Sequence, residues 1–575
     1  MRTEILSIFI MKHKRLIYVF AGVFVIILVT IALISPHEVY KRVFADDVTS
    51  TVIVGNSAPV ISGNAAESPA SVGTTPTNVG ANVTFQATAN DSNSEDFYLA
   101  VCTTDAVTAV NGDAPTCDVA TWCVSTATSS GSQASCNYTA LVGDGESNAW
   151  YAFVCDGNAT SAACSTSNQG TGDSGSPFKV NHRPTFNAIS NDTPKDPGAD
   201  ITWSTDVSTT DGDTDTSADT VKLIVCKTTG LTDDDCDGGA SDRWCNSSFV
   251  ANDPSCAYSI PNPTADGANA SYVYIVDNHY FPATGANQGS DESYTVNNIA
   301  PVVSALTING GSAITLDADT TTNVTLGATV VDNNACGDIS TVLGYMYRSG
   351  VGYTTNCDDN GDDDDNDCYA DVSCSVVGSG NTCDGASDAS ADYECTVATQ
   401  FHADPTIAGT EYPSEDWLDT LKATDDDAAT HNAEVGTGVE MNTTIGYDVT
   451  ETEIDYGTLD VLDSNDPLDK TTEVVATGNV GLDEELSGVN LTSGGDNIPV
   501  GNEHYALAGS TAYSSGTALT TSAVEAELNC LKTTNSASKQ TKNTWWGIYI
   551  PGGTATGTYN GTVTIVSILG ETAGW

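Results

Sequence analysis

Acidic and amide side chains at alternate positions are the residues of this sequence best suited to bind an ion. Three segments carry them, and a short Asp run follows further along the chain. Calcium takes about six to eight hard oxygen ligands, and alternating carboxylates in a turn can supply several of them on one side. We therefore predict calcium sites formed by Asp91, Asn93 and Glu95; Asp211, Asp213, Asp215 and Asp219; Asp332, Asn334 and Asp338; and Asp425, Asp426 and Asp427.

The same loops admit a second interpretation. Asp and Asn favour turns for conformational reasons, and their charges can simply be solvated. None of the loops matches the EF-hand consensus, because the final Glu is missing at the required offset. A further acidic run, "DDNGDDDDND" at 358–367, is flanked by Cys357 and Cys368. It is open to the same two interpretations, a calcium loop or a solvated loop tied by a disulfide.

A cysteine pattern occurs twice along the chain. The second copy has Val276 where the first has Cys155, and it also lacks a counterpart of Cys164, so we predict that Cys155 and Cys164 pair with each other. The shared cysteines form two bridges per copy, with their connectivity left open. They are Cys102, Cys117, Cys123 and Cys136 in the first copy and Cys226, Cys236, Cys245 and Cys256 in the second.

A third segment carries six more cysteines, which can form three bridges: Cys336, Cys357, Cys368, Cys374, Cys383 and Cys395. Such a framework is typical of proteins in an oxidising, extracellular environment. Cys530 in "AELNCLKT" is left over from the 17 cysteines. It is either a small buried hydrophobe on a strand or the site of an intermolecular disulfide.

One motif imitates an active site. The segment "GDSGSP" at 172–177 nearly reproduces the "GDSGGP" motif around the nucleophile of trypsin-like proteases. Those enzymes place the catalytic His and Asp before the Ser, but the histidines before Ser174 are only His13 and His37, in or beside the N-terminal apolar segment. No HExxH, P-loop or GxGxxG motif is present either. We predict that the chain is not an enzyme.

The net charge of −58 results from a shortage of basic residues, since 18 Lys and Arg stand against 76 Asp and Glu. Charged residues make up 16% of the chain, against roughly 25% in an average soluble domain. Nucleic acids and anionic membrane surfaces both need Lys and Arg for binding. The composition therefore argues against either as a partner.

The N-terminus has the pattern of an export segment. Four basic residues precede an apolar run at 16–34, and Val43 and Ala45 satisfy the small-residue rule for signal cleavage. The run is also long enough to remain as an N-terminal membrane anchor. Both alternatives place the remainder outside the cytoplasm, and any contact with a membrane is through 16–34 of the uncleaved chain.

Strands must position the acidic loops. "NVTFQATAN", "DITWSTDV" and "NVTLGATVV" alternate apolar and polar residues directly before the three loops, and the segment 414–427 alternates in the same way. Short segments in which Asn stands shortly before Pro recur as "GNSAP", "VNHRP" and "NNIAP". We call these segments seams, because they mark the boundaries between successive modules. We predict an all-β chain of tandem antiparallel β-sandwiches, divided into 1–45 (a signal peptide or apolar anchor helix), 55–181, 182–298, 299–440 (disulfide-rich) and 441–575.

The segments "ATGNVGLDEELSG" and "TWWGIYIPGGTATGTYNGTVTIVSIL" resemble immunoglobulin-like domains of exported prokaryotic surface proteins, and the modules with acidic loops resemble PKD-like sandwiches. The resemblance implies immunoglobulin-like modules and a surface location. Together with the disulfides and the acidic loops, it leads us to expect a secreted or cell-surface structural or adhesion protein of rod-like modules, which calcium bound at those loops would stiffen. Its partner would be an extracellular protein, a glycan or another copy of itself. The alternatives are a self-assembling surface-layer or filament subunit and, with less support, the accessory region of a secreted hydrolase.

Overall fold

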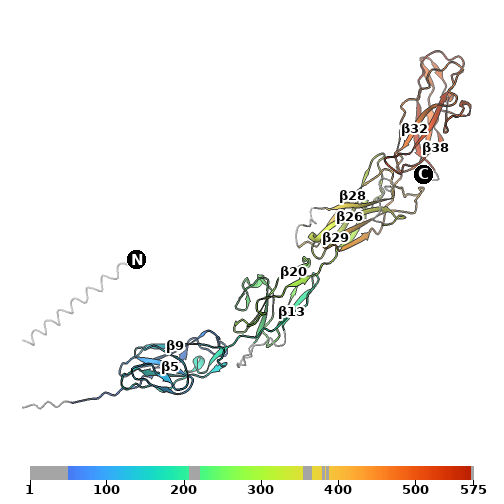
Figure 1. The fold of residues 1–575 in the computed structure, drawn as a ribbon. Helices are drawn as coiled ribbons and strands as arrows, with labels where there is room; N and C mark the ends of the chain where they lie inside the picture. Colours follow the sequence, from blue (N-terminus) through green and yellow to red (C-terminus); the bar gives the residue numbers. More distant parts are fainter. Residues whose placement is uncertain (1–49, 206–219, 354–365, 379–382, 384–386, 572–575) are drawn as a thin grey trace, which may run out of the picture. The chain divides into compact units, whose positions relative to one another are not determined.

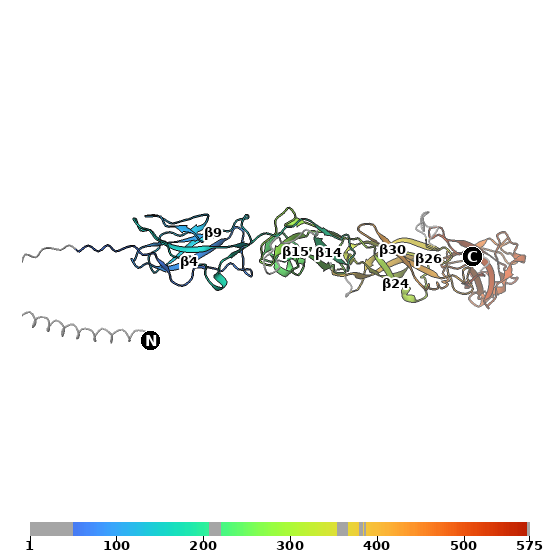
Figure 2. The same cartoon turned by 90° about the horizontal axis from the view of Figure 1, so that it is seen from below.

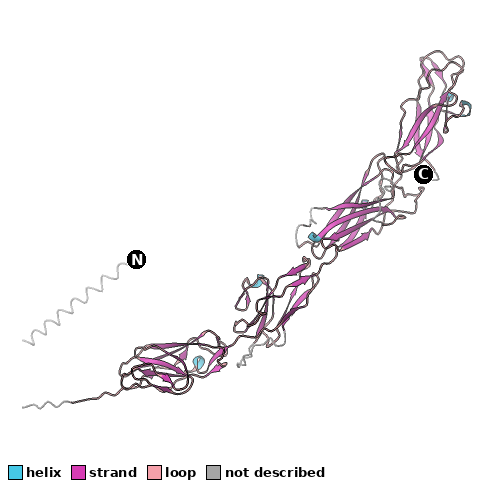
Figure 3. Ribbon diagram, in the orientation of Figure 1, coloured by secondary structure: helices cyan, strands magenta, loops and turns pink. Residues whose placement is uncertain are grey.

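The structure is a computed structural model that describes residues 50–205, 220–353, 366–378, 383 and 387–571. Within these ranges the chain forms forty β-strands and six 3-10 helices of one turn (Figure 3). All the described strands belong to one compact unit, Ala58–Trp575. The prediction of an all-β chain is thus confirmed. The predicted export segment at 1–45 lies outside the described residues.

We call residues 55–181, 182–298, 299–440 and 441–575 modules 1 to 4. Each described sheet draws its strands from a single module (Figure 1). Each of modules 1 to 3 also has a main core of its own, and module 4 has two. Each module therefore has its own sheets and its own hydrophobic core, as expected of domains arranged in tandem.

Module 1 is organised around β4 (Asn82–Asn90), which buries every second residue. Strand β9 (Gln133–Thr139) lies beside it (Figure 2). The core lies between this sheet and the one formed by β11 (Tyr151–Asp156), β5 (Phe97–Cys102) and β8 (Thr121–Val124). The other elements are β1 (Val60–Ile61), β2 (Ala66–Glu67), β3 (Thr77–Asn78), β6 (Val107–Thr108), β7 (Thr116–Cys117), β10 (Ser147–Asn148), η1 (Gly172–Ser174) and β12 (Phe178–Asn181).

One pairing in module 1 departs from the predicted antiparallel arrangement. Strand β12 pairs with β3 in parallel, with Val180 opposite Thr77. The two strands lie at opposite ends of the module sequence, so no hairpin imposes an antiparallel direction on them. The segment that imitates a protease motif lies in η1 and the turn before β12.

Module 2 repeats this plan. Its sheets are β13-β14-β19 and β18-β15-β21-β22, and between them the rings of Trp203 and Tyr294 meet edge to face at 5.7 Å. The elements are β13 (Ile189–Asn191), β14 (Asp200–Thr205), β15 (Val221–Cys226), β16 (Leu231–Thr232), β17 (Asp235–Cys236), η2 (Gly239–Ser241), β18 (Arg243–Asn246), β19 (Ser255–Ser259), β20 (Gly267–Asn269), β21 (Tyr272–Asp277), β22 (Ser290–Asp291) and β23 (Tyr294–Val296).

Module 3 wraps one seven-stranded sheet around its core, because β27 pairs with strands of both halves. The ends of this sheet approach each other, with β24 lying beside β30 (Figure 2). The strand predicted within 414–427 is confirmed as β29. The elements are β24 (Val302–Ile308), η3 (Asn309–Gly311), β25 (Thr322–Val331), η4 (Cys336–Asp338), β26 (Ile339–Arg348), β27 (Cys368–Val376), β28 (Ser390–Thr399), β29 (Trp417–Asp425) and β30 (Thr430–Glu434).

Module 4 packs a five-stranded sheet, β31-β32-β39-β36-β37, on a three-stranded sheet, β38-β33-β40. Its elements are β31 (Tyr447–Val449), β32 (Lys470–Ala476), β33 (Leu482–Gly488), β34 (Leu491–Ser493), β35 (Asp496–Ile498), η5 (Val500–Asn502), β36 (Glu503–Ala506), η6 (Tyr513–Ser515), β37 (Thr517–Ala518), β38 (Val524–Cys530), β39 (Thr541–Ile548) and β40 (Val563–Leu569).

Disulfides join neighbouring elements inside modules 1 to 3. The structure joins Cys155 to Cys164, the pair that the comparison of the two cysteine patterns predicts. Cys357 lies outside the described residues, and the leftover Cys530 is free and buried. The other bridges between described residues are Cys102–Cys117, Cys123–Cys136, Cys226–Cys236, Cys245–Cys256, Cys336–Cys383 and Cys374–Cys395.

Candidate cation sites at the module ends

The same strand register brings an Asp to the acidic loop in modules 1 and 3. In module 1 the loop ends where β5 begins, and Phe97, the first residue of β5, lies opposite Asp156. In module 3 Ile339, the first residue of β26, lies opposite Asp425. The pairing therefore places a carboxylate from the end of a distant strand beside the loop.

Five carboxylates from different segments meet at the acidic loop of module 3, in two overlapping groups. Asp332, Asp338 and Asp425 can each direct an oxygen to within 4.8 Å of the other two, and so can Asp266, Asp338 and Asp426. Asp332 is completely buried and Asp425 nearly so, whereas Asp426 is exposed. Asp338 belongs to both groups.

Several oxygens in this cluster are buried and accept no hydrogen bond. Asp332 Oδ1 accepts the backbone N–H of Asn334 at 2.8 Å, but Asp332 Oδ2 has no partner. Asn298 donates its amide to Asp425 Oδ2 at 3.0 Å, and its Oδ1 is buried without a partner, as is Asp338 Oδ2. An unpaired buried polar oxygen is costly. A cation among these atoms would supply the missing partner.

The electrostatics of the cluster point the same way. Burial, reinforced by Asp426, raises the pKa of Asp338 to about 7. The pKa of Asp332 is raised as well, mainly by burial and further by the charges of Asp425, Asp266 and Asp426. Like charges in a poorly solvated place destabilise one another, and a divalent cation removes this repulsion.

Two predicted ligands of module 3 lie elsewhere. Asn334 donates its amide to the carbonyls of Thr264 at 3.2 Å and Asn297 at 2.9 Å, and its Oδ1 accepts the N–H of Ile299 at 2.6 Å. Its side chain thus ties the seam of modules 2 and 3 to the loop. Asp427 is exposed and belongs to neither carboxylate group, although it lies close enough to Asp266 for the two carboxyls to interact.

Module 1 has a smaller cluster formed by Asp91, Glu95 and Asp156, whose oxygens also approach within 4.8 Å. Asp91 Oδ1 accepts the N–H of Asn93 at 2.6 Å, and Glu95 Oε1 accepts the amide of Asn158 at 2.8 Å. The other oxygens, Asp91 Oδ2 and Glu95 Oε2, are buried and accept no hydrogen bond. The cluster therefore combines two predicted ligands from the loop with one from the end of β11, Asp156, that was not predicted.

Module 2 shows part of the same arrangement. Its predicted ligands Asp211, Asp213, Asp215 and Asp219 lie outside the described residues. Asp277 ends β21 opposite Val221, in the register of Asp156 and Asp425. Asp277 Oδ2 accepts the amide of Asn181 at 2.8 Å, as Asp425 accepts that of Asn298. Burial raises the pKa of Asp277.

The sequence contained signals for the residues that the prediction missed. Asn181 and Asn298 each stand three residues before a Pro, and Asn56 does the same in the first seam. Asp156, Asp277 and Asp425 each end a strand that pairs with the strand after an acidic loop. For Asp266 no sequence signal exists, because it lies in an ordinary loop between β19 and β20.

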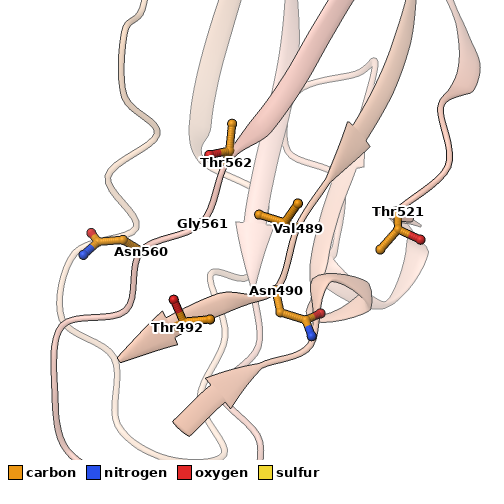
Figure 4. Close-up of a pocket in the computed structure, with 7 residues that line it drawn as sticks. All are labelled: Val489, Asn490, Thr492, Thr521, Asn560, Gly561 and Thr562. Atoms are coloured by element: carbon orange, nitrogen blue, oxygen red, sulfur yellow. The ribbon is translucent and has the colours of Figure 1, made fainter. Parts of the chain in front are cut away.

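Module 4 has two features that could also form sites. Asp483, Glu527 and Glu571 form a further carboxylate group, of which the latter two are exposed. A shallow hollow in the same module carries no ionisable side chain among its lining residues (Figure 4), which are Val489, Asn490, Thr492, Thr521, Asn560, Gly561 and Thr562. The module 3 cluster is therefore the best-formed candidate site in the described part of the chain.

The fold and the disulfides define the class of protein: an all-β chain of disulfide-containing modules, a construction typical of extracellular proteins. In the described ranges, no helix combines the length and apolar character needed to cross a membrane.

No protein-family model and no curated protein matches the sequence. Among solved structures, the chain is similar to a fragment of the ICAM-5 ectodomain, domains D1–D4, at 8% identity and a TM-score of 0.26, covering 82% of this chain and 96% of that one. It is similar to a marsupial T cell receptor at 8% identity and a TM-score of 0.21, covering 63% and 98%. It is also similar to dimeric latent PorU from Porphyromonas gingivalis at 12% identity and a TM-score of 0.15, covering 72% and 36%. Similarities at these TM-scores support no conclusion about function.

Proposed function

We propose that this chain is an extracellular or cell-surface structural or adhesion protein whose β-sandwich modules bind calcium at their loop ends. The observation that supports the proposal is the repeated carboxylate cluster with buried, unpartnered oxygens in modules 1 and 3. The ion would hold the acidic loop to the end of the distant strand and, in module 3, to the preceding seam. Its role would be mechanical, to make the module ends rigid.

Calcium titration tests the binding part of this proposal. The protein without its predicted export segment, residues 46–575, is called the exported chain below. After treatment with a chelator, it should unfold at a higher temperature when calcium is added. At about 100 times the dissociation constant the gain is about 2.7 kcal/mol. Asp332→Asn should reduce the gain, whereas Asp448→Asn, at an exposed position of β31, should leave it unchanged. An unfolding temperature that ignores both calcium and chelator would contradict the proposal.

Electron microscopy of the same protein tests the structural role. Isolated elongated particles that straighten with calcium would support a structural or adhesive role for the single molecule. Ordered arrays or fibres would instead identify the alternative, a self-assembling surface-layer or filament subunit. Particles with the same flexibility in calcium and in chelator would refute calcium stiffening.

A further inference from the structure

The two carboxylate groups of module 3 share one residue and differ in their surroundings. The inner group, Asp332, Asp338 and Asp425, contains the two buried carboxylates. The outer group shares Asp338 and adds the exposed Asp426 and the half-buried Asp266 of module 2. Asp338 is the one residue that belongs to both groups. An ion placed in one group would therefore lack the other two carboxylates of the second group.

From this arrangement we propose that the seam of modules 2 and 3 binds two divalent cations, bridged by Asp338. The inner ion lies among Asp332, Asp338 and Asp425, and the outer ion lies among Asp266, Asp338 and Asp426. The proposal rests on the proposed function for the identity of the ion, calcium. It adds the number of ions, their ligand sets and the part of the preceding module that closes the outer site.

Charge balance favours two ions over one. The two groups contain five carboxylates, and no ion pair between described residues includes any of them. A single divalent cation would leave three of the five negative charges uncompensated, whereas two cations leave one. Ions in two-metal sites lie about 3.5–4 Å apart, which is close enough for the two oxygens of one carboxylate to contact both ions.

The buried polar atoms point to an inner ligand independently of the acidic charges. Asp332 is completely buried and its Oδ2 has no partner, although its other oxygen is held by the N–H of Asn334. Asn298 donates its amide to Asp425 Oδ2 and leaves its own Oδ1 buried without a partner. A hard cation takes both carboxylate and amide oxygens.

The outer ion would connect two modules. The loop that carries Asp266 already contacts the acidic loop through its backbone, because the Thr264 N–H donates to the Asn333 carbonyl at 3.1 Å. The Thr264 carbonyl in turn accepts the amide of Asn334 at 3.2 Å. These bonds hold Asp266 near Asp338 and Asp426 before an ion arrives, so the outer ion completes an existing contact.

The number of bound ions tests the proposal. Equilibrium dialysis of the full exported chain against saturating calcium, followed by atomic absorption, gives the calcium bound per chain. Asp266→Asn should lower this number by one and leave the inner ion, and Asp338→Asn should lower it by two. Asp317→Asn is the control, since Asp317 is an exposed Asp of module 3 that belongs to neither group. It should bind as much calcium as the unaltered chain.

Circular dichroism spectra and cooperative unfolding would verify that each variant is folded. Asp266→Asn should fold normally, because Asp266 lies outside the hydrophobic cores. Equal losses of one ion in Asp338→Asn and Asp332→Asn, with none in Asp266→Asn, would overturn the two-ion arrangement and leave calcium binding itself intact. An unaltered chain that binds no calcium would instead refute the proposed function on which the inference rests.

Discussion

At the scale of single residues, Cys530 shows how burial decides chemistry. It ends β38 inside a core of module 4, only 1% exposed, and burial raises the pKa of its thiol to about 11. The thiolate is the reactive form of cysteine. Of the two interpretations of this leftover cysteine, the structure favours the buried hydrophobe over an intermolecular disulfide.

Cys530 should therefore resist alkylation in the folded protein. We expect iodoacetamide at pH 8 to leave it unmodified in native buffer and to modify it fully in urea, as measured by intact mass. Rapid labelling of the native chain, or a dimer that disappears with reducing agent and in Cys530→Ser, would contradict this expectation.

A buried carboxyl in module 4 should make stability depend on pH. Burial raises the pKa of Glu503 from 4.5 to about 7, although the Tyr456 hydroxyl donates to its Oε1 at 3.1 Å. Between these values the folded chain retains a proton that the unfolded chain has released. The free energy of unfolding therefore falls as the pH rises through this window. The stabilising contribution of the protonated carboxyl is complete below the unfolded pKa and is lost as the pH passes the folded pKa.

Glu503→Gln should remove this dependence, because Gln keeps an acceptor for Tyr456 and carries no charge. Relative to the unaltered chain, we expect a gain on the order of 3 kcal/mol at pH 8 and little difference near pH 4.5. Urea unfolding at the two pH values measures the difference. An equal gain at both would show that titration of Glu503 is not its cause.

At the scale of elements, the Cys155–Cys164 disulfide acts on the strand end that carries Asp156. Asp156 Oδ1 accepts the N–H of Ala163 at 3.1 Å, directly beside the bridge. The loop between the cysteines is therefore tied to the carboxylate that completes the module 1 cluster.

Replacing both Cys155 and Cys164 by Ala should lower the stability of module 1 by about 2–4 kcal/mol. It should also weaken calcium binding at Asp91, Glu95 and Asp156. The Cys226–Cys236 bridge of module 2 closes a loop of similar length and provides the control. Its removal should cost similar stability without changing calcium affinity in module 1. Titration calorimetry of both variants makes the comparison, and equal effects on affinity would contradict a local role of the bridge.

At the scale of the whole molecule, a buried ion-pair network joins modules 3 and 4. Asp404 is completely buried, accepts the Nε of Arg348 at 3.1 Å and pairs with Lys532 of module 4. Removing one partner of such a network leaves uncompensated charge in a place without water. The two modules should therefore depend on each other for stability.

Asp404→Asn should destabilise the pair of modules by about 3–5 kcal/mol and should separate their calorimetric transitions. The control is Asp319→Asn, which removes the partner of Lys539 in a second ion pair between these modules, where both side chains are partly exposed. That change should cost only about 0–1 kcal/mol. Similar costs for the two variants would argue against coupling through Asp404.

Much of the architecture was predictable because it depends on local order. Alternation along "NVTFQATAN" is visible in the sequence and becomes the buried face of β4. Comparison of two cysteine patterns was enough to select Cys155 and Cys164. The parallel pairing of β12 with β3 was not predictable in this way, because no local feature of either strand specifies its partner.

The candidate site was likewise predictable only in part from the sequence. Residue types and spacing alone determined that Asp91, Glu95, Asp332, Asp338 and Asp425 were plausible cation ligands. Only the tertiary structure added Asp156 and Asp266, showed that the amide of Asn298 donates to Asp425, placed Asp427 outside both carboxylate groups and assigned the amide of Asn334 to the seam. The reason is physical: a cation site needs oxygens that converge in space, and that convergence depends on long-range pairings such as Ile339 with Asp425.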